Sequence, residues 1–396
     1  LNWSYNDMYL HRIRYNVNGT HSVDYHYRDT RNNINLEYKD AALGLRSTLA
    51  YNKRRSYSDK YTYSSKKYEV SERYTMDGLT WDTQKEWKPR DGKDDFILGF
   101  TFSRESAYGL LTADKTLWIN THRTSESLYA SYAWQAAPRF TMTLGLRGEH
   151  ISDYSKTQNI FLPQFQTNYK FDDNSSWYIN IGKAFQMPTV DDSFRYTNFN
   201  PTGLKPESGW TYETGVKIRR GSTAWKAAIY HMDMKNKIGW RYNAPTDEHY
   251  AVNTGQFRNT GFELEYMKRF NDMWSLTLGG SVSNPEVQNP EGTDKAWVQD
   301  AARLQGLVRL DYRMAKWQGN LNLKYLGDRE YTAQRYGAAQ DVPDKIQLNM
   351  NMIYTAGKDD VVSLGIYNLL DRENYSNRYG NLDLGRNFRL TYTHAF

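Results

Sequence analysis

Side chains alternate between apolar and polar along almost the whole 396-residue chain. In the clearest segment, 140–147, every even position carries Phe, Met or Leu and every odd position carries Thr, Gly or Arg. A period of two is that of a β-strand, whose successive side chains point to opposite faces. Charged residues recur too often on the second face for a packed core, and they suit a wet lumen. The alternation therefore predicts strands with one apolar and one hydrated face.

The final segment, 384–396, reads LGRNFRLTYTHAF and ends on an aromatic residue. Counting back in twos from Phe396 places His394, Tyr392, Leu390 and Phe388 on one face. A strand needs neighbouring strands to satisfy its backbone donors and acceptors. We therefore expect this segment to be the closing strand of a large sheet.

Composition favours strands and excludes several chemistries. The chain has 33 Tyr, 15 Phe and 12 Trp but only 10 Pro, and it has no Cys. Aromatic residues are enriched in strands, and the lack of cysteine excludes disulfides, Cys-ligated zinc and thiol catalysis. The net charge of +6 comes from 51 Lys and Arg against 45 Asp and Glu, all scattered through the chain. This pattern favours a mixed-sign surface over a nucleic-acid site.

Hydropathy excludes a spanning helix but not a membrane location. Mean hydropathy is −0.84, and no run approaches the roughly 20 apolar residues that a transmembrane helix needs. A membrane β-barrel presents only every second residue to lipid, so its average can stay hydrophilic. The chain begins LNWSYND, without an initiating Met or a signal-like segment, so we expect further sequence upstream.

Connections between the predicted strands alternate in length from the middle of the chain. Short turns are predicted near 136–139, 172–175, 219–222, 270–273, 315–317 and 356–360. Long polar connections are predicted near 187–207, 235–254, 285–303, 329–344 and 371–384. Tight turns on one rim and long loops on the other describe an outer-membrane barrel with periplasmic turns and extracellular loops. A soluble propeller is the alternative, but each interval holds two long strands and no recurring blade signal.

We therefore predict an all-β fold, a transmembrane antiparallel β-barrel with about 19 strands in this chain. The first strand would lie near 9–17 and run toward the periplasmic rim, and the last strand would run the same way and bring Phe396 to that rim. An odd number of antiparallel strands cannot close, and single-chain bacterial barrels are even-numbered. We expect about three strands, and whatever precedes them, to lie outside the printed chain.

Several phrases in the second half of the chain form a family pattern. Residues 185–189 read FQMPT, residues 200–207 read NPTGLKPE, and a tyrosine and a glutamate follow. Three further phrases are NTGQFRNTGFELEY from Asn253, IYNLLDRENY from Ile366, and the closing GRNFRLTYTHAF. Together they resemble the TonB-dependent outer-membrane receptors of siderophores, haem and cobalamin. The matching positions are Phe185, Pro188, Thr189, Asn200, Pro201, Leu204, Lys205, Pro206, Glu207, Tyr212 and Glu213.

The resemblance implies that residues 1–396 are the C-terminal barrel portion of a receptor with 22 strands when complete. It also implies an N-terminal plug with a box that binds TonB, which are not in this sequence. Such a receptor would sit in the bacterial outer membrane among lipid and lipopolysaccharide, as a monomer. It would capture a scarce extracellular ligand and import it with TonB-transduced energy, and it would be no enzyme and need no cofactor. The terminal aromatic, Phe396, resembles the signal recognised by the barrel-assembly machinery.

The predicted loops carry aromatic and basic side chains together. Aromatic faces and guanidinium groups suit a flat, anionic, partly apolar small-molecule metal chelate such as a ferric siderophore, through stacking, cation–π contact and charge. Loop packing or an aromatic girdle is the structural alternative for each residue. The candidates are Trp118, His122, Arg123, Arg195, Tyr196, Phe199, Trp240, Arg241, Tyr242, Tyr331, Arg335, Tyr336, Tyr375, Arg378 and Tyr379.

Other functions stay open at this stage. Haem receptors carry similar phrases, usually with a histidine between them, but no His lies between Phe185 and Leu204, so a haem ligand would have to be His122, His231 or His249. Cobalamin is a further cargo. A passive porin or an outer-membrane hydrolase would share the strand pattern, although the chain has no HExxH motif and no Gly-rich phosphate loop. Asp191 and Asp192 could bind calcium in a loop, but solvated carboxylates are the simpler interpretation, so we predict no metal site.

Overall fold

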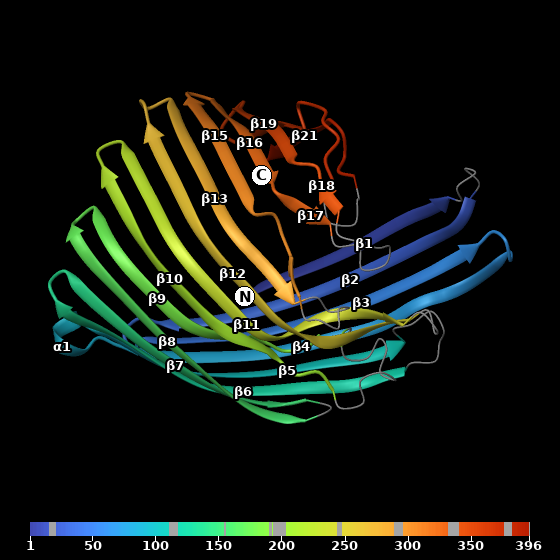
Figure 1. Cartoon of the computed structure of the whole chain (residues 1–396), viewed down its shortest axis with the longest axis horizontal. Helices are drawn as coiled ribbons and strands as arrows, with labels where there is room; N and C mark the ends of the chain where they lie inside the picture. The colour runs from blue at the N-terminus through green and yellow to red at the C-terminus, as the bar shows by residue number, and fades with distance from the viewer. Residues whose placement is uncertain are drawn as a thin grey trace.

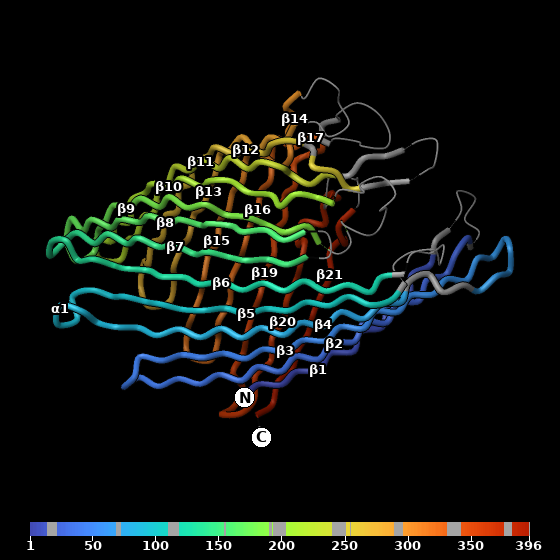
Figure 2. Tube along the Cα trace, turned by 90° about the horizontal axis from the view of Figure 1, so that it is seen from below, coloured from blue at the N-terminus to red at the C-terminus, as the bar shows by residue number. Residues whose placement is uncertain are grey.

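The chain forms one strongly curved antiparallel sheet with a separate small hairpin (Figure 1, Figure 2). The structure is a computed structural model that describes residues 1–15, 21–110, 118–153, 156–189, 192, 203–243, 248–288, 296–331, 340–375 and 382–395. One short helical turn, α1 (Pro89–Gly92), lies in this part of the chain, and none of its described helical residues belongs to a segment that could span a membrane as a helix.

Nineteen strands make up the main sheet, as the sequence predicts. The first nine are β1 (Asn2–Tyr15), β2 (His21–Asp40), β3 (Leu45–Thr62), β4 (Lys67–Trp87), β5 (Asp95–Leu110), β6 (Trp118–Ala137), β7 (Phe140–Ser152), β8 (Thr157–Asp172) and β9 (Ser175–Gln186). The others are β10 (Glu207–Arg220), β11 (Thr223–Asn243), β12 (Glu248–Arg269), β13 (Trp274–Gln288), β14 (Trp297–Gln299), β15 (Leu304–Met314), β16 (Trp317–Gly327), β19 (Lys345–Thr355), β20 (Asp360–Tyr367) and β21 (Asn387–His394). The small hairpin pairs β17 (Arg329–Tyr331) with β18 (Gln340–Val342).

Each strand pairs with its neighbours in the sequence, but two of the strands occupy the same position in the sheet. Both β14 and β15 pair with β13, through Glu286 opposite Gln299 and Val282 opposite Leu304. Together they form one interrupted strand, so the number of strand positions in the sheet is even. The first strand consequently runs opposite to the last, so the predicted direction and bounds of the first strand are wrong. Among the described residues, β1 pairs only with β2 and β21 only with β20.

All six predicted short turns are confirmed, whereas three long connections contain more strand than expected, one of them being 329–344, which holds the β17–β18 hairpin. β11 continues to Asn243 and β12 begins at Glu248, so most of 235–254 is strand, with a register shift around Lys237. β13 likewise continues through Pro285 to Gln288. These stretches have frequent charged and amide residues and no regular apolar–polar alternation. A strand needs an apolar outer face only where it crosses the bilayer. These stretches extend beyond the bilayer, so their sequence does not alternate as a lipid-facing strand does.

The two faces of the sheet have the predicted chemistry. Leu144 and Leu390 are exposed on the outer face, at 59% and 75% of their surface. On the inner face of β9 and β10, Tyr178 donates a hydrogen bond of 2.6 Å to Glu213. Gly215 leaves room for that tyrosine, since a Cβ there would lie 2.6 Å from its hydroxyl. An apolar outside and a polar inside are the arrangement of a barrel in lipid with a wet lumen.

The short-turn rim is reinforced by aromatic pairs and by cations that link neighbouring turns. Trp225 and Tyr266 lie 4.2 Å apart by ring centroid across β11 and β12, and Trp317 and Tyr354 lie 4.6 Å apart across β16 and β19. The cations bridge adjacent turns: Arg220 to the Asp172 carboxylate at 2.7 Å, Arg139 to the Phe171 carbonyl at 2.8 Å, and Lys316 to the Ala356 carbonyl at 3.2 Å. Aromatic residues at this level mark a membrane interface.

Candidate ligand-capture rim

The described candidates lie at the end of the sheet opposite α1, where the long connections begin (Figure 2). His122 and Arg123 lie near the start of β6, at the long-connection end of that strand, and Tyr375 follows β20. The backbone, but not the side chain, is described for Trp118 in β6, for Trp240, Arg241 and Tyr242 in β11, and for Tyr331 in β17. Outside the described residues lie Asp191, Arg195, Tyr196, Phe199, Asn200, Pro201, Arg335, Tyr336, Arg378, Tyr379 and Phe396.

His122 and Arg123 point to opposite faces because they are successive residues of a strand. His122 shares the outer face of β6 with the exposed Leu128, whereas Arg123 faces inward. The other described histidine side chains, those of His11, His26, His150, His231 and His394, also share the outward parity of their strands. Within the described side chains, therefore, no histidine lines the lumen.

Arg123 holds the start of the long connection after β9. Its guanidinium donates to the Asp153 carboxylate at 3.0 Å and to the Pro188 carbonyl at 2.8 Å. The side chains of Arg123 and Asp153 are only 16% and 6% exposed. A charged hydrogen bond in such a shielded place is strong. Arg123 therefore links the segment around Pro188 to β6 and to the residue that follows β7, Asp153. Nothing in the sequence predicts this role of Arg123.

Glu207 fastens the end of the same connection to β11. It is 6% exposed and accepts hydrogen bonds from the Ile238 backbone amide at 2.8 Å and from the Lys237 ammonium at 3.2 Å. Both partners follow Asn236, whose φ of 57° marks the register shift in β11. At the register shift the Ile238 backbone amide donates to the Glu207 carboxylate instead of to the neighbouring strand, so its hydrogen bond is still made.

A second clamp joins Lys205 to β12 through Asn253. The Asn253 side chain accepts from the Lys205 backbone amide at 2.8 Å and donates to the Lys205 carbonyl at 2.9 Å. It also donates to the Asn236 carbonyl at 2.7 Å. Leu204 beside this clamp is buried, at 4% exposed. The LKPE and NTGQ phrases are therefore two halves of one anchor, although they are far apart in the sequence.

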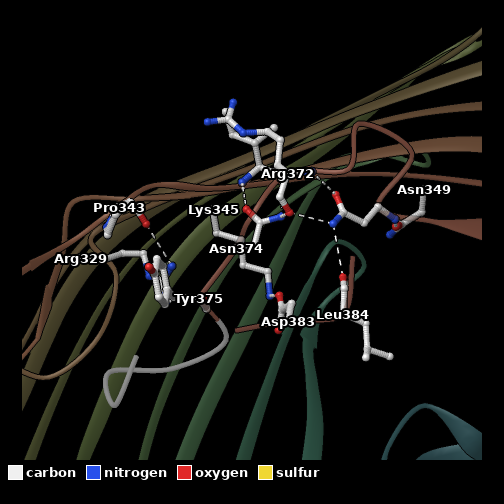
Figure 3. Close-up of polar contacts among 11 residues, drawn as sticks. Arg329, Pro343, Lys345, Asn349, Arg372, Asn374, Tyr375, Asp383 and Leu384 are labelled. Carbon is white, nitrogen blue, oxygen red and sulfur yellow. Dashed lines mark hydrogen bonds and ion pairs between the residues drawn. The ribbon is translucent and has the colours of Figure 1, made fainter. Parts of the chain in front are cut away.

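Two buried asparagines, Asn368 and Asn374, organise the segment after β20. Figure 3 shows Asn374 among the neighbouring polar side chains. Asn368 donates to the Arg372 carbonyl at 2.8 Å and to the Leu384 carbonyl at 3.3 Å, and it accepts from the Arg372 amide at 3.2 Å. Asn374 donates to the Ile346 carbonyl and accepts from the Ile346 amide, both at 3.0 Å. The IYNLLDRENY phrase is therefore an anchor that folds this segment back onto β19.

The same segment is joined to the β17–β18 hairpin. Arg329 donates to the Tyr375 carbonyl at 3.0 Å and to the Pro343 carbonyl at 3.3 Å (Figure 3). Lys345 forms an ion pair with Asp383 in the same cluster. The stems of two predicted binding loops, those with Arg335 and Tyr336 and with Arg378 and Tyr379, are therefore held together.

The inner wall below the rim has a hollow of about 580 Å³, lined by charged and apolar side chains. Charged side chains from four strands, β11, β12, β16 and β19, line it: Lys226, Glu263, Glu265, Lys324 and Lys345. Neighbouring charges of both signs favour water or a polar surface over an apolar ligand. Within the described ranges, no group of three or more His, Asp or Glu side chains could hold a metal ion.

The sequence identified these motifs but did not predict which contacts their residues make. Sequence reasoning read Pro188, Leu204, Lys205 and Glu207 as loop anchors or binding residues, and the structure places all four in contacts that fix loop stems. It did not single out Asp153, Asn253, Asn368 or Asn374. The only available signal was that the three asparagines lie in or next to phrases already recognised, because a buried asparagine is recognisable only from its partners.

The fold and the polar inner wall define the class of the protein as an outer-membrane β-barrel. A family model described as TonB dependent receptor-like, beta-barrel matches residues 1–369, so the chain belongs to the TonB-dependent receptor family and lies in the outer membrane. The Copper transporter OprC has a similar structure, with a TM-score of 0.76 and 14% identity over 95% of this chain and 67% of its own.

Two siderophore-receptor structures are also similar. The siderophore receptor PirA from Acinetobacter baumannii has a TM-score of 0.69 and 13% identity over 96% of this chain and 63% of its own. A mutant of the ferric enterobactin receptor PfeA from Pseudomonas aeruginosa has a TM-score of 0.72 and 13% identity over 96% of this chain and 62% of its own. At such identities the likeness shows the fold alone, and the chain spans less than two thirds of the length of both receptors.

Proposed function

We propose that the complete receptor captures a ferric siderophore at the long-loop rim and imports it with energy transduced by TonB. The observation that carries this is the anchoring of loop stems by buried polar side chains. Asn374 fixes the stem of one predicted binding loop, and Glu207 and Arg123 fix the two ends of another. A loop held at its stem loses less conformational entropy when it binds a ligand. The rim is therefore suited to capture rather than passive flow.

The loop side chains are the proposed contacts. Aromatic and guanidinium groups on these loops would stack on and neutralise a flat anionic chelate. The proposed residues are Trp118, Arg195, Tyr196, Phe199, Trp240, Arg241, Tyr242, Tyr331, Arg335, Tyr336, Tyr375, Arg378 and Tyr379, with Arg123 as a support. His122 is left out because its side chain lies on the outer face of β6. The chain would act as a monomer, with a plug and TonB box supplied by sequence outside residues 1–396. The terminal Phe396 would engage the barrel-assembly machinery, and lipid and lipopolysaccharide would surround the barrel.

Haem is the alternative cargo with the most specific structural requirement. A lumenal haem would need an inward histidine or a histidine on a loop. The described histidine side chains all face outward, and His231 is engaged with the Thr260 hydroxyl at 2.7 Å. The side chain of the third candidate, His249, lies outside the described part of the structure. This arrangement favours a siderophore over haem. The experiment below distinguishes uptake of a siderophore from uptake of cobalamin or copper and from passive diffusion.

The test uses the full-length receptor with ferric enterobactin as the probe. We expect saturable binding to the wild type, and a loss of affinity of about tenfold or more when Arg335 and Tyr336 are both replaced by alanine, which corresponds to about 1.4 kcal/mol. Lys358→Ala, on an exposed turn at the opposite rim, is the matched control and should bind as the wild type does. Saturable binding of cobalamin or copper instead of the probe, or uptake that persists without TonB, would contradict the proposal.

A further inference from the structure

The inner faces of β16 and β19 carry a continuous line of carboxamide side chains, which we call the amide strip. The two strands lie side by side (Figure 1), and their alternate residues Leu321 and Met352 are exposed on the outer face. The strip consists of Gln318, Asn320, Asn322, Gln347, Asn349 and Asn351. β16 has 11 residues, which cover roughly 35 Å along a strand, enough to cross the apolar band of about 25 Å in a tilted barrel. The strip therefore follows the wall across the membrane.

The amide strip joins two hollows of the inner wall. The hollow of about 580 Å³ below the long-loop rim includes Gln347, near the long-loop end of the strip. A second hollow, of about 500 Å³, lies at the short-turn end and includes Asn320 and Asn351. Between the two hollows lies the pair formed by Asn322 and Asn349, which are directly opposite each other. The strip therefore connects a recess near the rim with a recess near the periplasmic turns.

Most carboxamides of the strip have no hydrogen-bond partner among the described residues. The exception is Asn349, whose side chain accepts from the Asn368 backbone amide at 3.0 Å. The buried carbonyl oxygen of Asn322 is left without a partner in the same part of the chain. A polar group in a folded protein is seldom idle unless water or a solute meets it. The strip therefore presents amide donors to a solute in the lumen.

The sector of the inner wall around the strip is free of carboxylates. The inward residues of β16, β19, β20 and β21, all of them described, include no Asp or Glu. Two cations on these faces, Lys324 and Arg389, form no ion pair within the described part of the chain, and a third, Lys345, pairs with a loop acid. On the neighbouring β15 the one inward acid, Asp311, is paired with Arg309 at 2.7 Å. The sector therefore carries a net positive charge.

Other sectors of the inner wall present acids to the lumen. Glu213 on β10, Glu263 and Glu265 on β12, and Asp82 on β4 all have inward parity. The inward faces of β8 and β9 also lack acids, but Glu213 reaches across to β9, where it accepts from Tyr178 at 2.6 Å. Like charges repel, most strongly where water is limited. An anion in the lumen therefore meets cations and amide donors at β16 and β19, and carboxylates elsewhere.

We propose that the amide strip is the wall along which an anionic chelate crosses the outer membrane in the complete receptor. Lys324 draws the anion from the rim into the first hollow, and the carboxamides of Asn322 and Asn320 then donate to its oxygens in turn. An uncharged donor holds an anion more weakly than a cation does. Several weak sites in a row suit passage, which requires that each site be easily left. The inference rests on the proposed function for the charge of the cargo and adds its path.

The first experiment needs no cargo and uses the full-length receptor in cells with active TonB. Asn322→Cys and, as the matched control, Asn180→Cys each provide the only cysteine, and Asn180 lies opposite Glu213 on another wall. Each variant reacts with an anionic and with a cationic membrane-impermeant methanethiosulfonate, and each rate is divided by the rate with free cysteine. The anionic-to-cationic ratio should be about threefold or more higher for Asn322→Cys. No reaction at this position, as under a plug that never leaves the strip, would overturn the proposal, as would equal ratios.

The second experiment measures uptake of ferric enterobactin by cells with the full-length receptor. Asn320→Asp combined with Asn322→Asp keeps the side-chain shape but adds negative charge, so uptake should slow about fivefold or more at unchanged affinity. Asn180→Asp is the control and should keep the wild-type rate, and Asn322→Gln should keep most of it. The single Asp variants are measured as well, so that an assembly failure of the double variant leaves the question decidable.

Two outcomes of the uptake experiment would overturn the proposal. One is a wild-type uptake rate in the Asp variants. The other is a TonB-independent leak of polar solutes in these variants, which would show that the strip only seats the plug. A wild type that fails to bind ferric enterobactin would contradict the proposed function instead, and the labelling ratio at Asn322→Cys would still decide the path.

Discussion

The side-chain amide of Asn374 takes the place of a strand residue beside Ile346, because it both donates to and accepts from that residue's backbone at 3.0 Å. β20 pairs with β19 only from Met350 to Thr355, which leaves the earlier part of β19 without a strand neighbour on that side. The segment after β20 supplies the missing partners: the Leu369 amide donates to Leu348, and Asn374 serves Ile346. A loop stem thereby completes the ladder.

Replacing Asn374 by Ala should destabilise the rim by about 1–3 kcal/mol, because it leaves the buried backbone groups of Ile346 unsatisfied. The measurement is the free energy of unfolding in urea, together with proteolysis of the segment after β20, which should become faster. Asn120→Ala, at an exposed position of β6, is the control and should change neither. An equal effect of the two substitutions would contradict the anchoring role.

Glu207→Ala should cost more stability than Glu207→Gln. The alanine leaves the Ile238 amide and the Lys237 ammonium without this partner, at a cost of about 1–3 kcal/mol, whereas glutamine keeps an acceptor for the amide. Hydrogen exchange at the Ile238 amide reports the difference, with strong protection expected in the wild type and Gln variant. Similar exchange in the wild type and the Ala variant would show that the contact does not hold the loop stem.

Leu390→Lys should destabilise the barrel by roughly 2–4 kcal/mol if the residue lies near the middle of the bilayer. Leu390 is on the outer face of β21, and its neighbour Thr391 is on the inner face. Thr391→Lys should therefore cost less, because it places the charge in the wet lumen. Unfolding in lipid vesicles compares the two, and the reverse order of cost would show that the faces are assigned wrongly.

Asp94 should stay ionised far below the pH at which an ordinary aspartate is protonated. Its carboxylate lies in the turn before β5 and accepts from Arg90 at 2.6 Å, from Tyr132 and from the Gln135 amide at 2.9 Å. The Arg90 contact, with those of Tyr132 and Gln135, lowers the pKa of Asp94 to about 2.

A folded-state pKa below the unfolded value contributes stability that is present above about pH 4 and is lost as the pH falls through about 2. The Gln135 amide resonance in NMR should therefore stay constant down to about pH 3 and shift below it. In Asp94→Asn the resonance should lack this transition. A midpoint near pH 4 in the wild type would contradict the contact.

Local patterns were enough to predict the architecture. Alternation of the type seen in 140–147 identified the strands and their lipid-facing side, and the short breaks between alternating segments located the six short turns. The number of strands in the sheet followed from the same reasoning. The predicted direction of the first strand was wrong because the predicted count of about 19 is one more than the number of strand positions in the sheet, where β14 and β15 share a position. Since β14 lies inside the connection predicted near 285–303, the extra strand was counted in the N-terminal part of the chain, where the alternation is least regular.

The candidate site was less predictable. The sequence by itself determined the class of the protein and the phrases that mark its loop stems, because periodicity and turn chemistry are local. Only the tertiary structure decided that Arg123 holds Pro188, that Asn253 joins Lys205 to Asn236, and that Asn374 completes the edge of β19. Each of these roles depends on strand register, which brings together residues that are distant in the chain, and a polar side chain takes its function from the partner it meets there.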